Sequence, residues 1–230
     1  MTALPKRQQN RIERERRILQ AALKVFSETG YSGATMDAVA IEAGLSKPTL
    51  YQFFESKEAL FSAMMLGERD RMLDVFERPS PGGMVEDLLG FAWDYADTVM
   101  RPDMISLARL IIGEVQRFPE IGRAYQEVGP DRLLRGIMDY LDDRRRSGRR
   151  LAFEDAELAA QDLWGLILSA PRTQALYMPD RQPSRAEIAR YINNGLRVFL
   201  KAYSTNPEGD LAELDPLIVA HSVKQVDHDN

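Results

Sequence analysis

The sequence of 230 residues contains no cysteine, and its only histidines, His221 and His228, lie near the C-terminus. The missing cysteines exclude a disulfide framework and thiolate metal sites, and the position of the histidines excludes a histidine-based triad or zinc cluster in the folded body. No apolar run approaches the roughly 20 residues that a membrane span needs. The N-terminus also lacks a signal-like apolar stretch. We therefore expect a cytoplasmic protein without a metal site.

Signs of catalytic chemistry are also missing. No Gly-rich phosphate loop, metal-ligand spacing or nucleophile–base pair stands out, so no cofactor is predicted and the chain is not expected to be an enzyme. An all-α enzyme with scattered Asp and Glu residues stays as the remote alternative. No segment persuasively alternates apolar and polar residues as strands do, and there is no internal repeat. The pattern predicts an all-α fold of nine or ten helices.

The charge is unevenly distributed along the chain. The formal net charge is −5, but residues 1–24 contain seven basic and two acidic side chains. A basic front on an acidic body is typical of a nucleic-acid-binding segment followed by a non-binding remainder. The alternative is that the first helix is simply rich in solvated charges.

Residues 35–54 have the pattern of two short helices joined by a tight turn. Gly44 supplies the left-handed conformation that ends a helix, and Ser46 is a cap for the next one. Pro48 is tolerated in a first turn because the amides there have no intrahelical partner. Ala40 is small enough for a steep helix crossing. The stretch predicts a helix-turn-helix, in which the apolar faces are formed by Met36, Val39, Ala40, Ala43, Leu50, Tyr51 and Phe54.

Other segments read as helices with local start and stop signals. Asn10 is expected to cap the first helix, which ends before Gly30. Thr35, Ser56 and Ser184 are expected to cap later helices, the last in a capping box with Glu187. Further helices are expected over the ranges 57–78, 84–100, 102–118, 120–128, 131–146, 154–177 and 184–204. The helix 154–177 is expected to be strained or to end near Pro171, and breaks in helical continuity are expected at Pro207, Gly209 and Pro216.

Residues 11–60 resemble the DNA-binding domain of the TetR family, the tetracycline-repressor-like regulators. About fifty residues match in order. The residues that carry the resemblance are Ala22 to Phe26, Gly30-Tyr31, Thr35 to Ala40, Ala43 to Lys47, Thr49-Leu50-Tyr51, Phe54 and Ser56 to Leu60. Pro48 stands where many relatives have Gly, and Phe53, which has no hydroxyl, where many have Tyr or His. Residues 109–120 are similar to the C-terminal domain of multidrug-efflux-type, AefR-like members.

The resemblance implies a division of the chain into functional parts. These are a flexible basic arm (1–9), a helix-turn-helix DNA-binding domain (10–56), a connecting helix (57–78), a ligand-binding and dimerisation domain (84–204) and a C-terminal tail (205–230).

The resemblance also implies phosphate contacts from Thr35, Tyr51 and Lys57. The exposed side of the recognition helix is expected to carry Ser46, Lys47, Pro48, Thr49, Gln52 and Phe53. Lys47 can donate to guanine, and Gln52 can bond adenine bidentately. Arg14, Arg16 and Arg17 are candidates for further contacts.

The acidic body is expected to sense a ligand and to dimerise. Its candidate pocket residues are Trp93, Tyr95, Phe118, Tyr125, Met138, Trp164 and Tyr177. Aromatic residues at helical spacing are more often plain core, so core packing is the alternative for each of them. The helices 154–177 and 184–204 are expected to form a homodimer across a two-fold axis.

The sequence thus predicts a homodimeric repressor that binds double-stranded DNA at a palindromic operator and is released by a small, largely apolar effector. An alternative keeps DNA binding but replaces the effector with a protein partner or with no effector.

Overall fold

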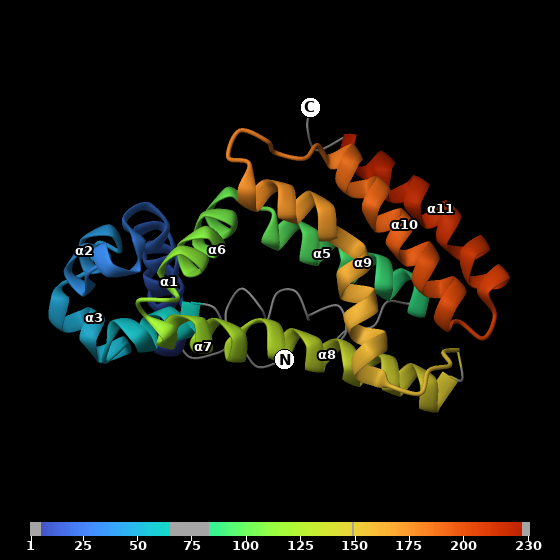
Figure 1. Cartoon of the computed structure of the whole chain (residues 1–230). Coiled ribbons are helices and arrows are strands. Elements are labelled where there is room, and N and C mark those ends of the chain that lie inside the picture. Colours follow the sequence, from blue (N-terminus) through green and yellow to red (C-terminus); the bar gives the residue numbers. More distant parts are fainter. Residues whose placement is uncertain (1–5, 65–82, 149, 227–230) are drawn as a thin grey trace. The chain divides into compact units, whose positions relative to one another are not determined.

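The computed structural model describes residues 6–64, 83–148 and 150–226, and the fold over these ranges is all-α, as predicted (Figure 1). In the described ranges it contains ten named α-helices, a further helical stretch at residues 57–64, one turn of π-helix and no β-strand. No helix within them is long and apolar enough to cross a membrane. The helices are α1 (Lys6–Gly33), α2 (Met36–Glu42), α3 (Lys47–Phe53), α5 (Met84–Val99), α6 (Pro102–Glu114), α7 (Pro119–Val128), α8 (Pro130–Asp143), α9 (Ala156–Tyr177), α10 (Arg185–Tyr203) and α11 (Pro207–Val226), with the π-turn η1 at Arg144–Gly148.

Residues 57–64 are also helical, and the hydroxyl of Ser56 accepts a hydrogen bond from the Ala59 amide at 3.1 Å, so this predicted cap is confirmed. The remainder of the predicted helix 57–78 and most of the predicted loop at 79–83 lie outside the described residues. By its contacts the chain divides into two compact units. Unit 1 holds the described residues of 6–64 and 101–130, and unit 2 holds those of 83–100 and 131–226.

In unit 1, α1 is longer than predicted. It begins at Lys6 rather than at Asn10, so Asn10 lies inside the helix and residues 6–9 belong to it. No glycine or proline interrupts residues 6–17, and the helix therefore extends toward the N-terminus. The regular helix breaks at Gly30, where φ is 76°. A positive φ carries little steric cost only for glycine, so this position turns the chain and places Tyr31 in the core.

The core of unit 1 joins α1, α2 and α3 to α6 and α7. Tyr31 stacks on Phe26 with ring centroids 5.8 Å apart and meets Phe61 edge-on at 5.6 Å. Tyr31 also contacts Phe118 at 5.7 Å. The α6 residues packed into the same core are Met104, Leu107 and Ile111. Contacts therefore group α6 and α7 with the N-terminal helices, although both fall within the sequence range 84–204.

Unit 2 contains α5, α8, α9, α10 and α11 around a second apolar core. Helices α9 and α10 pack closely, because a Cβ at Gly195 would stand only 2.6 Å from the carbonyl oxygen of Leu166. Pro171 lies inside α9, and the helix is kinked at Leu168 (φ −138°, ψ 16°). The missing N–H of Pro171 removes a helical hydrogen bond. This agrees with the strain predicted there, but the helix continues to Tyr177.

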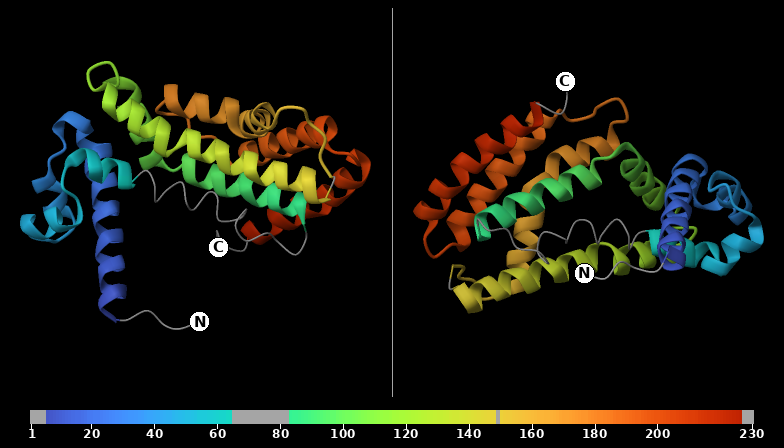
Figure 2. Two further views of the ribbon diagram at one scale, coloured as in Figure 1. Left: turned by 90° about the horizontal axis from the view of Figure 1, so that it is seen from below. Right: turned by 180° about the vertical axis from the view of Figure 1, so that it is seen from behind.

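The C-terminal residues form a helix where the sequence predicted interruptions. Pro207 starts α11, where its missing N–H costs nothing, and Pro216 lies within the helix. The chain leaves regular helix at residues 204–206, so helical continuity is broken directly before Pro207, whereas the breaks expected at Gly209 and Pro216 are wrong. Figure 2 shows α11 running beside α10 in both views. The Asp210 carboxylate is 1% exposed and accepts hydrogen bonds from Arg150 and, at 2.6 Å, from the Ser204 hydroxyl. These tertiary bonds, with buried Leu214, fix the helix to unit 2.

Candidate functional site

The helix-turn-helix is built by local caps. The Thr35 hydroxyl accepts a hydrogen bond from the Ala38 amide at 3.1 Å and starts α2. Gly44, with φ of 64°, makes the turn. The Ser46 hydroxyl then accepts from the Thr49 amide at 3.4 Å and starts α3. These caps satisfy first-turn amides that have no helical partner, and the two predicted caps are confirmed.

Helix α3 has one buried side and one exposed side. Leu50 is fully buried and Phe54 is 7% exposed, and they hold the helix on the core of unit 1. Tyr51 is 43% exposed, and the side chains of Ser46, Lys47, Pro48 and Gln52 are also exposed. Thr49 and Phe53, which the sequence placed on the exposed side, are half-buried. The Phe53 ring packs partly on the core, with the Arg11 guanidinium 5.9 Å from its centroid. An arginine from α1 thus covers a ring that was expected to face outward.

The two predicted lysines have different surroundings. Lys47 forms an exposed ion pair with Asp37 at 2.8 Å, and this hydrogen bond raises the pKa of Lys47 above its ordinary value. Exposed ion pairs contribute about 0–1 kcal/mol, so an anion can compete with Asp37 for the lysine. Lys57 is half-buried, and its ammonium donates to the carbonyl oxygens of Tyr31 at 2.7 Å and Ala34 at 3.2 Å. Lys57 therefore also has a structural role.

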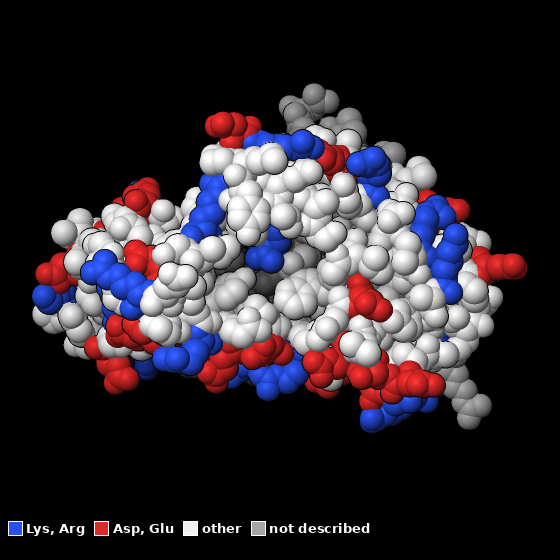
Figure 3. All heavy atoms as spheres, in the orientation of Figure 1, with Lys and Arg blue, Asp and Glu red and all other residues white. Residues whose placement is uncertain are grey.

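Arg17 holds the turn of the helix-turn-helix. Its guanidinium donates to the carbonyl oxygen of Ala43 at 2.8 Å and lies against Gly44. Arg14 and Arg16, the other arginines considered for DNA contacts, are exposed on α1. Acidic and basic side chains are intermixed over α2 and α3 in Figure 3. The positive charge available near α3 therefore comes from individual side chains rather than from a continuous basic patch on this face.

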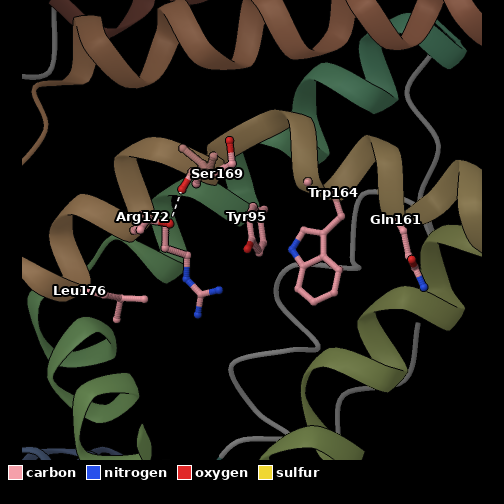
Figure 4. A pocket seen from close by; sticks show the side chains of 9 residues that line it. Tyr95, Gln161, Trp164, Ser169, Arg172 and Leu176 are labelled. Atoms are coloured by element: carbon pink, nitrogen blue, oxygen red, sulfur yellow. Dashed lines mark hydrogen bonds between the residues drawn. The ribbon is translucent and has the colours of Figure 1, made fainter.

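A pocket of about 240 Å³ lies in unit 2 along one side of α9. Tyr95 reaches it from α5, and its ring meets Trp164 edge-on with centroids 6.2 Å apart. Figure 4 shows Trp164, Tyr95 and Arg172 extending to the same side of the α9 ribbon. The Thr173 hydroxyl donates to the Ser169 carbonyl at 2.7 Å. The described residues that line it are Tyr95, Gln161, Trp164, Gly165, Leu168, Ser169, Arg172, Thr173 and Leu176.

Most of the predicted pocket residues lie elsewhere. Phe118 and Tyr125 belong to unit 1, where they pack against its core. Trp93 is 6% exposed in the core of unit 2, under the Arg185 guanidinium at 4.4 Å. Met138 packs against that core as well, and Tyr177 is 72% exposed. For these five residues the prediction does not match this pocket, because aromatic content alone does not distinguish a pocket wall from a core. Trp164 and Tyr95 do line it.

The residues that the sequence reasoning missed lie with Trp164 on one helical stripe. The lining positions on α9 are 161, 164, 165, 168, 169, 172, 173 and 176. The spacing of three and four residues marks one face of a helix, and this face carries an aromatic, a cationic and two hydroxyl side chains. That mixed composition was the available signal, since a plain core face lacks a cation.

Comparisons with known proteins agree with this architecture. Residues 18–64 match the family described as bacterial regulatory proteins, tetR family, and residues 86–205 match the AefR-like transcriptional repressor, C-terminal domain. The HTH-type transcriptional regulator UidR of Escherichia coli is 44% identical over 66 residues, which are 29% of this chain and 34% of UidR. The chain thus matches only about a third of the length of that relative. An HTH-type transcriptional repressor of Mycobacterium tuberculosis is 32% identical over 136 residues, 59% of this chain and 68% of that protein.

Solved structures extend the similarity to most of the chain. A TetR-family transcriptional regulator from Mesorhizobium loti is 30% identical with a TM-score of 0.71, covering 84% of this chain and 98% of that one. The flavonoid-responsive regulator FrrA is 31% identical with a TM-score of 0.62 and the same coverage. Both domain matches and the helix-turn-helix geometry lead to one conclusion. The chain belongs to the tetR family of bacterial regulatory proteins and is a DNA-binding transcriptional regulator.

Proposed function

We propose that this regulator is a homodimeric repressor that binds a palindromic operator through α3 and is released by a small, largely apolar effector. The observation that carries the proposal is α3 itself. Its apolar side is fixed by Leu50 and Phe54, while Lys47, Tyr51 and Gln52 extend from the opposite side. Dimeric helix-turn-helix proteins place such helices in successive major grooves about 34–36 Å apart. Its action on chromosomal DNA takes place in the cytoplasm.

The operator contacts divide into positioning and reading contacts. Thr35 stands at the N-terminus of α2, where backbone amides favour a phosphate. Tyr51 and the remaining donor of Lys57 bind phosphates as well. Lys47 exchanges Asp37 for a guanine, and Gln52 bonds adenine through both amide atoms. The other proposed contacts come from Ser46, Pro48, Thr49 and the outer edge of Phe53.

The dimer forms through α9 and α10. These helices already pack tightly in one chain, and they leave Leu158 58% exposed and Val198 42% exposed. The face of unit 2 over α9 carries few charged side chains in Figure 3. Pairing α9 and α10 with their copies across a two-fold axis buries this apolar surface.

The effector binds in the α9 pocket, whose walls combine aromatic and aliphatic side chains. Two of the similarities support release of a repressor by a small molecule. FrrA is named as flavonoid-responsive, and the family matched by the C-terminal residues is named for a repressor. The effector must have a higher affinity for the arrangement that does not fit the operator than for the one that does. A ligand with equal affinity for both states does not shift the equilibrium between them.

Footprinting on DNA upstream of the gene tests the proposal. We expect protection of a palindrome by the wild-type protein, and loss of protection for Lys47→Met and Tyr51→Ala at unchanged helical content. Arg132→Met is the control, because Arg132 is an exposed cation on α8, outside α3 and outside the proposed α9–α10 interface, and should leave protection intact. Protection that persists in both α3 variants would contradict the proposed reading helix.

A further inference from the structure

We propose that Arg11 of α1 binds a backbone phosphate of the operator next to the C-terminal end of α3, with its guanidinium held over the Phe53 ring. The inference rests on the proposed function, because it adds a contact to the same DNA interface. Arg11 lies outside residues 18–64, the range that matches the tetR family, so this contact does not follow from membership in the family. Its position, its partners and the charges around it carry the inference.

Helix α1 places Arg11 beside the recognition helix. The helix is regular from Lys6 up to Gly30. Arg11 precedes Ile18, which is fully buried in the core of unit 1, by about two helical turns. The two residues therefore lie on the same side of α1. The Arg11 guanidinium reaches α3, where it lies 5.9 Å from the centroid of the Phe53 ring.

The end of α3 that Arg11 reaches is suited to a phosphate contact. Lys47 is the first residue of α3 and Phe53 is the last. A recognition helix contacts base edges mainly through its N-terminal residues, so the C-terminal end of α3 lies nearer to the phosphates than to the bases. Lys47 is thus placed to read a base, and Arg11 is placed to bind the backbone.

Arg11 has donors to spare, in contrast to the other cations around α3. Lys47 pairs with a carboxylate, and Arg17 and Lys57 donate to backbone carbonyls. In the described part of the chain, the Phe53 ring is the only partner of the exposed Arg11 guanidinium. A contact with the face of a ring leaves the N–H donors unused. Phosphate oxygens bind these donors, and the ring limits the rotamer freedom that Arg11 loses on binding.

The charges around Arg11 favour an anion. Positions three and four residues away are its neighbours on the helix surface. Together with Arg11 they contain three arginines and one glutamate, a net of two positive charges, and they are Arg7, Gln8, Arg14 and Glu15. Phosphates are the anions that DNA presents to a protein at every sequence. A phosphate contact fixes the protein on the duplex but carries no sequence information.

The salt dependence of DNA binding tests the contact. Fluorescence anisotropy measures the affinity for the operator found by footprinting, and for a duplex of unrelated sequence, between about 50 and about 200 mM salt. For Arg11→Met we expect both affinities to fall by the same factor, about tenfold or more. The slope of log affinity against log salt should become shallower by about 1 for each protomer bound. Arg11→Lys should retain most of the slope.

Three further variants separate Arg11 from its surroundings. Arg132→Met, at an exposed arginine of α8, is the control and should retain the wild-type affinities and slope. Lys47→Met should weaken operator binding more than binding to the unrelated duplex, because it removes a base contact. In a Phe53→Leu background, Arg11→Met should have a smaller effect, because the ring no longer holds the guanidinium. Circular dichroism checks that each variant keeps its helical content.

A wild-type salt slope in Arg11→Met would overturn the inference. If affinity fell at that unchanged slope, Arg11 would act only by packing on Phe53. An effect of Arg11→Met that stays full in the Phe53→Leu background would overturn the placement by the ring. A wild-type protein that does not prefer the operator over the unrelated duplex would contradict the proposed function instead, and the slope on the unrelated duplex would still test Arg11.

Discussion

Lys47 and Lys57 carry the same charge, but their ammonium groups have different partners. Lys47 pairs with one exposed carboxylate, that of Asp37. Lys57 donates to two backbone carbonyls and lies 4.3 Å from the centroid of the Tyr31 ring. Substituting each lysine therefore affects a different property of the protein.

Lys57→Met should lower the free energy of unfolding by about 1–3 kcal/mol, because the Tyr31 and Ala34 carbonyls lose charged donors. Lys47→Met should leave it nearly unchanged, because its ion pair with Asp37 is exposed, and should weaken operator binding instead. Urea denaturation measures the first effect and footprinting the second. A loss of stability in Lys47→Met equal to that in Lys57→Met would contradict this division.

Glu58 makes the stability of unit 1 sensitive to acid. Its own backbone amide, and then the Ser56 hydroxyl, hold the pKa of Glu58 below its ordinary value of 4.5, and the Tyr31 hydroxyl donates to it at 3.1 Å. A carboxylate whose pKa is lower in the folded state than in the unfolded state stabilises the fold at pH values above its unfolded-state pKa. This contribution is lost as the pH falls through its folded-state pKa. Wild type should therefore exceed Glu58→Gln in stability at pH 7, and the gap should close as pH falls below about 4.5. A gap that stays constant in urea denaturation from pH 7 to pH 3 would refute this.

Single residues were predictable where their role is local. Thr35, Ser46 and Ser184 cap helices because a hydroxyl bonds an amide three residues on, as in the 3.2 Å bond to the Glu187 amide. The half-burial of Phe53 was not predictable, because it depends on Arg11 from a different helix. The same holds for Arg17, whose partner is the carbonyl of Ala43.

At the scale of elements, the α9–α10 crossing depends on the missing side chain of Gly195. Gly195→Ala places a Cβ 2.6 Å from the Leu166 oxygen and 2.8 Å from its carbonyl carbon, and backbone atoms cannot rotate away. We expect a loss of about 1–3 kcal/mol in the free energy of unfolding from this overpacking.

Gly113→Ala is the matched control for that substitution. Gly113 lies in α6, and an added Cβ would meet nothing within 4 Å. Alanine is the better helix former by up to about 1 kcal/mol, so this variant should gain stability. If both alanine variants were stabilised in urea denaturation, close packing at Gly195 would not limit the crossing.

Elements were predicted well where periodicity and caps agree, as in α2, α3 and α10. The start of α1 and the whole of α11 were missed for different reasons. A helix start without a strong cap is weakly marked in sequence, and Lys6 follows no such signal. In α11, proline propensity predicted a break at Pro216, but Pro216 lies inside a helix that the Arg150–Asp210 bond and buried Leu214 hold on unit 2.

At the scale of the whole molecule, membership in a family of transcriptional regulators confirms the predicted fold class and the prediction that the chain is not an enzyme. The sequence placed the helix-turn-helix correctly because its residues are contiguous. It placed only Trp164 and Tyr95 at the pocket, because the lining combines α5 with α9. Residues from separate helices meet only through tertiary packing, which spacing within one segment does not report.

The proposed dimer makes a prediction at this same scale. Wild type should sediment as a dimer at micromolar concentration, and Leu158→Glu combined with Val198→Glu should sediment as a monomer, because carboxylates would be buried in an apolar interface. Two linked DNA-binding domains bind an operator about a hundredfold or more tightly than one, so the monomer should lose operator affinity by that factor. Val219→Glu, at an α11 valine that is 64% exposed, is the control and should remain dimeric. A double variant that stays dimeric would place the interface on other helices, and a monomeric wild type would refute the dimer itself.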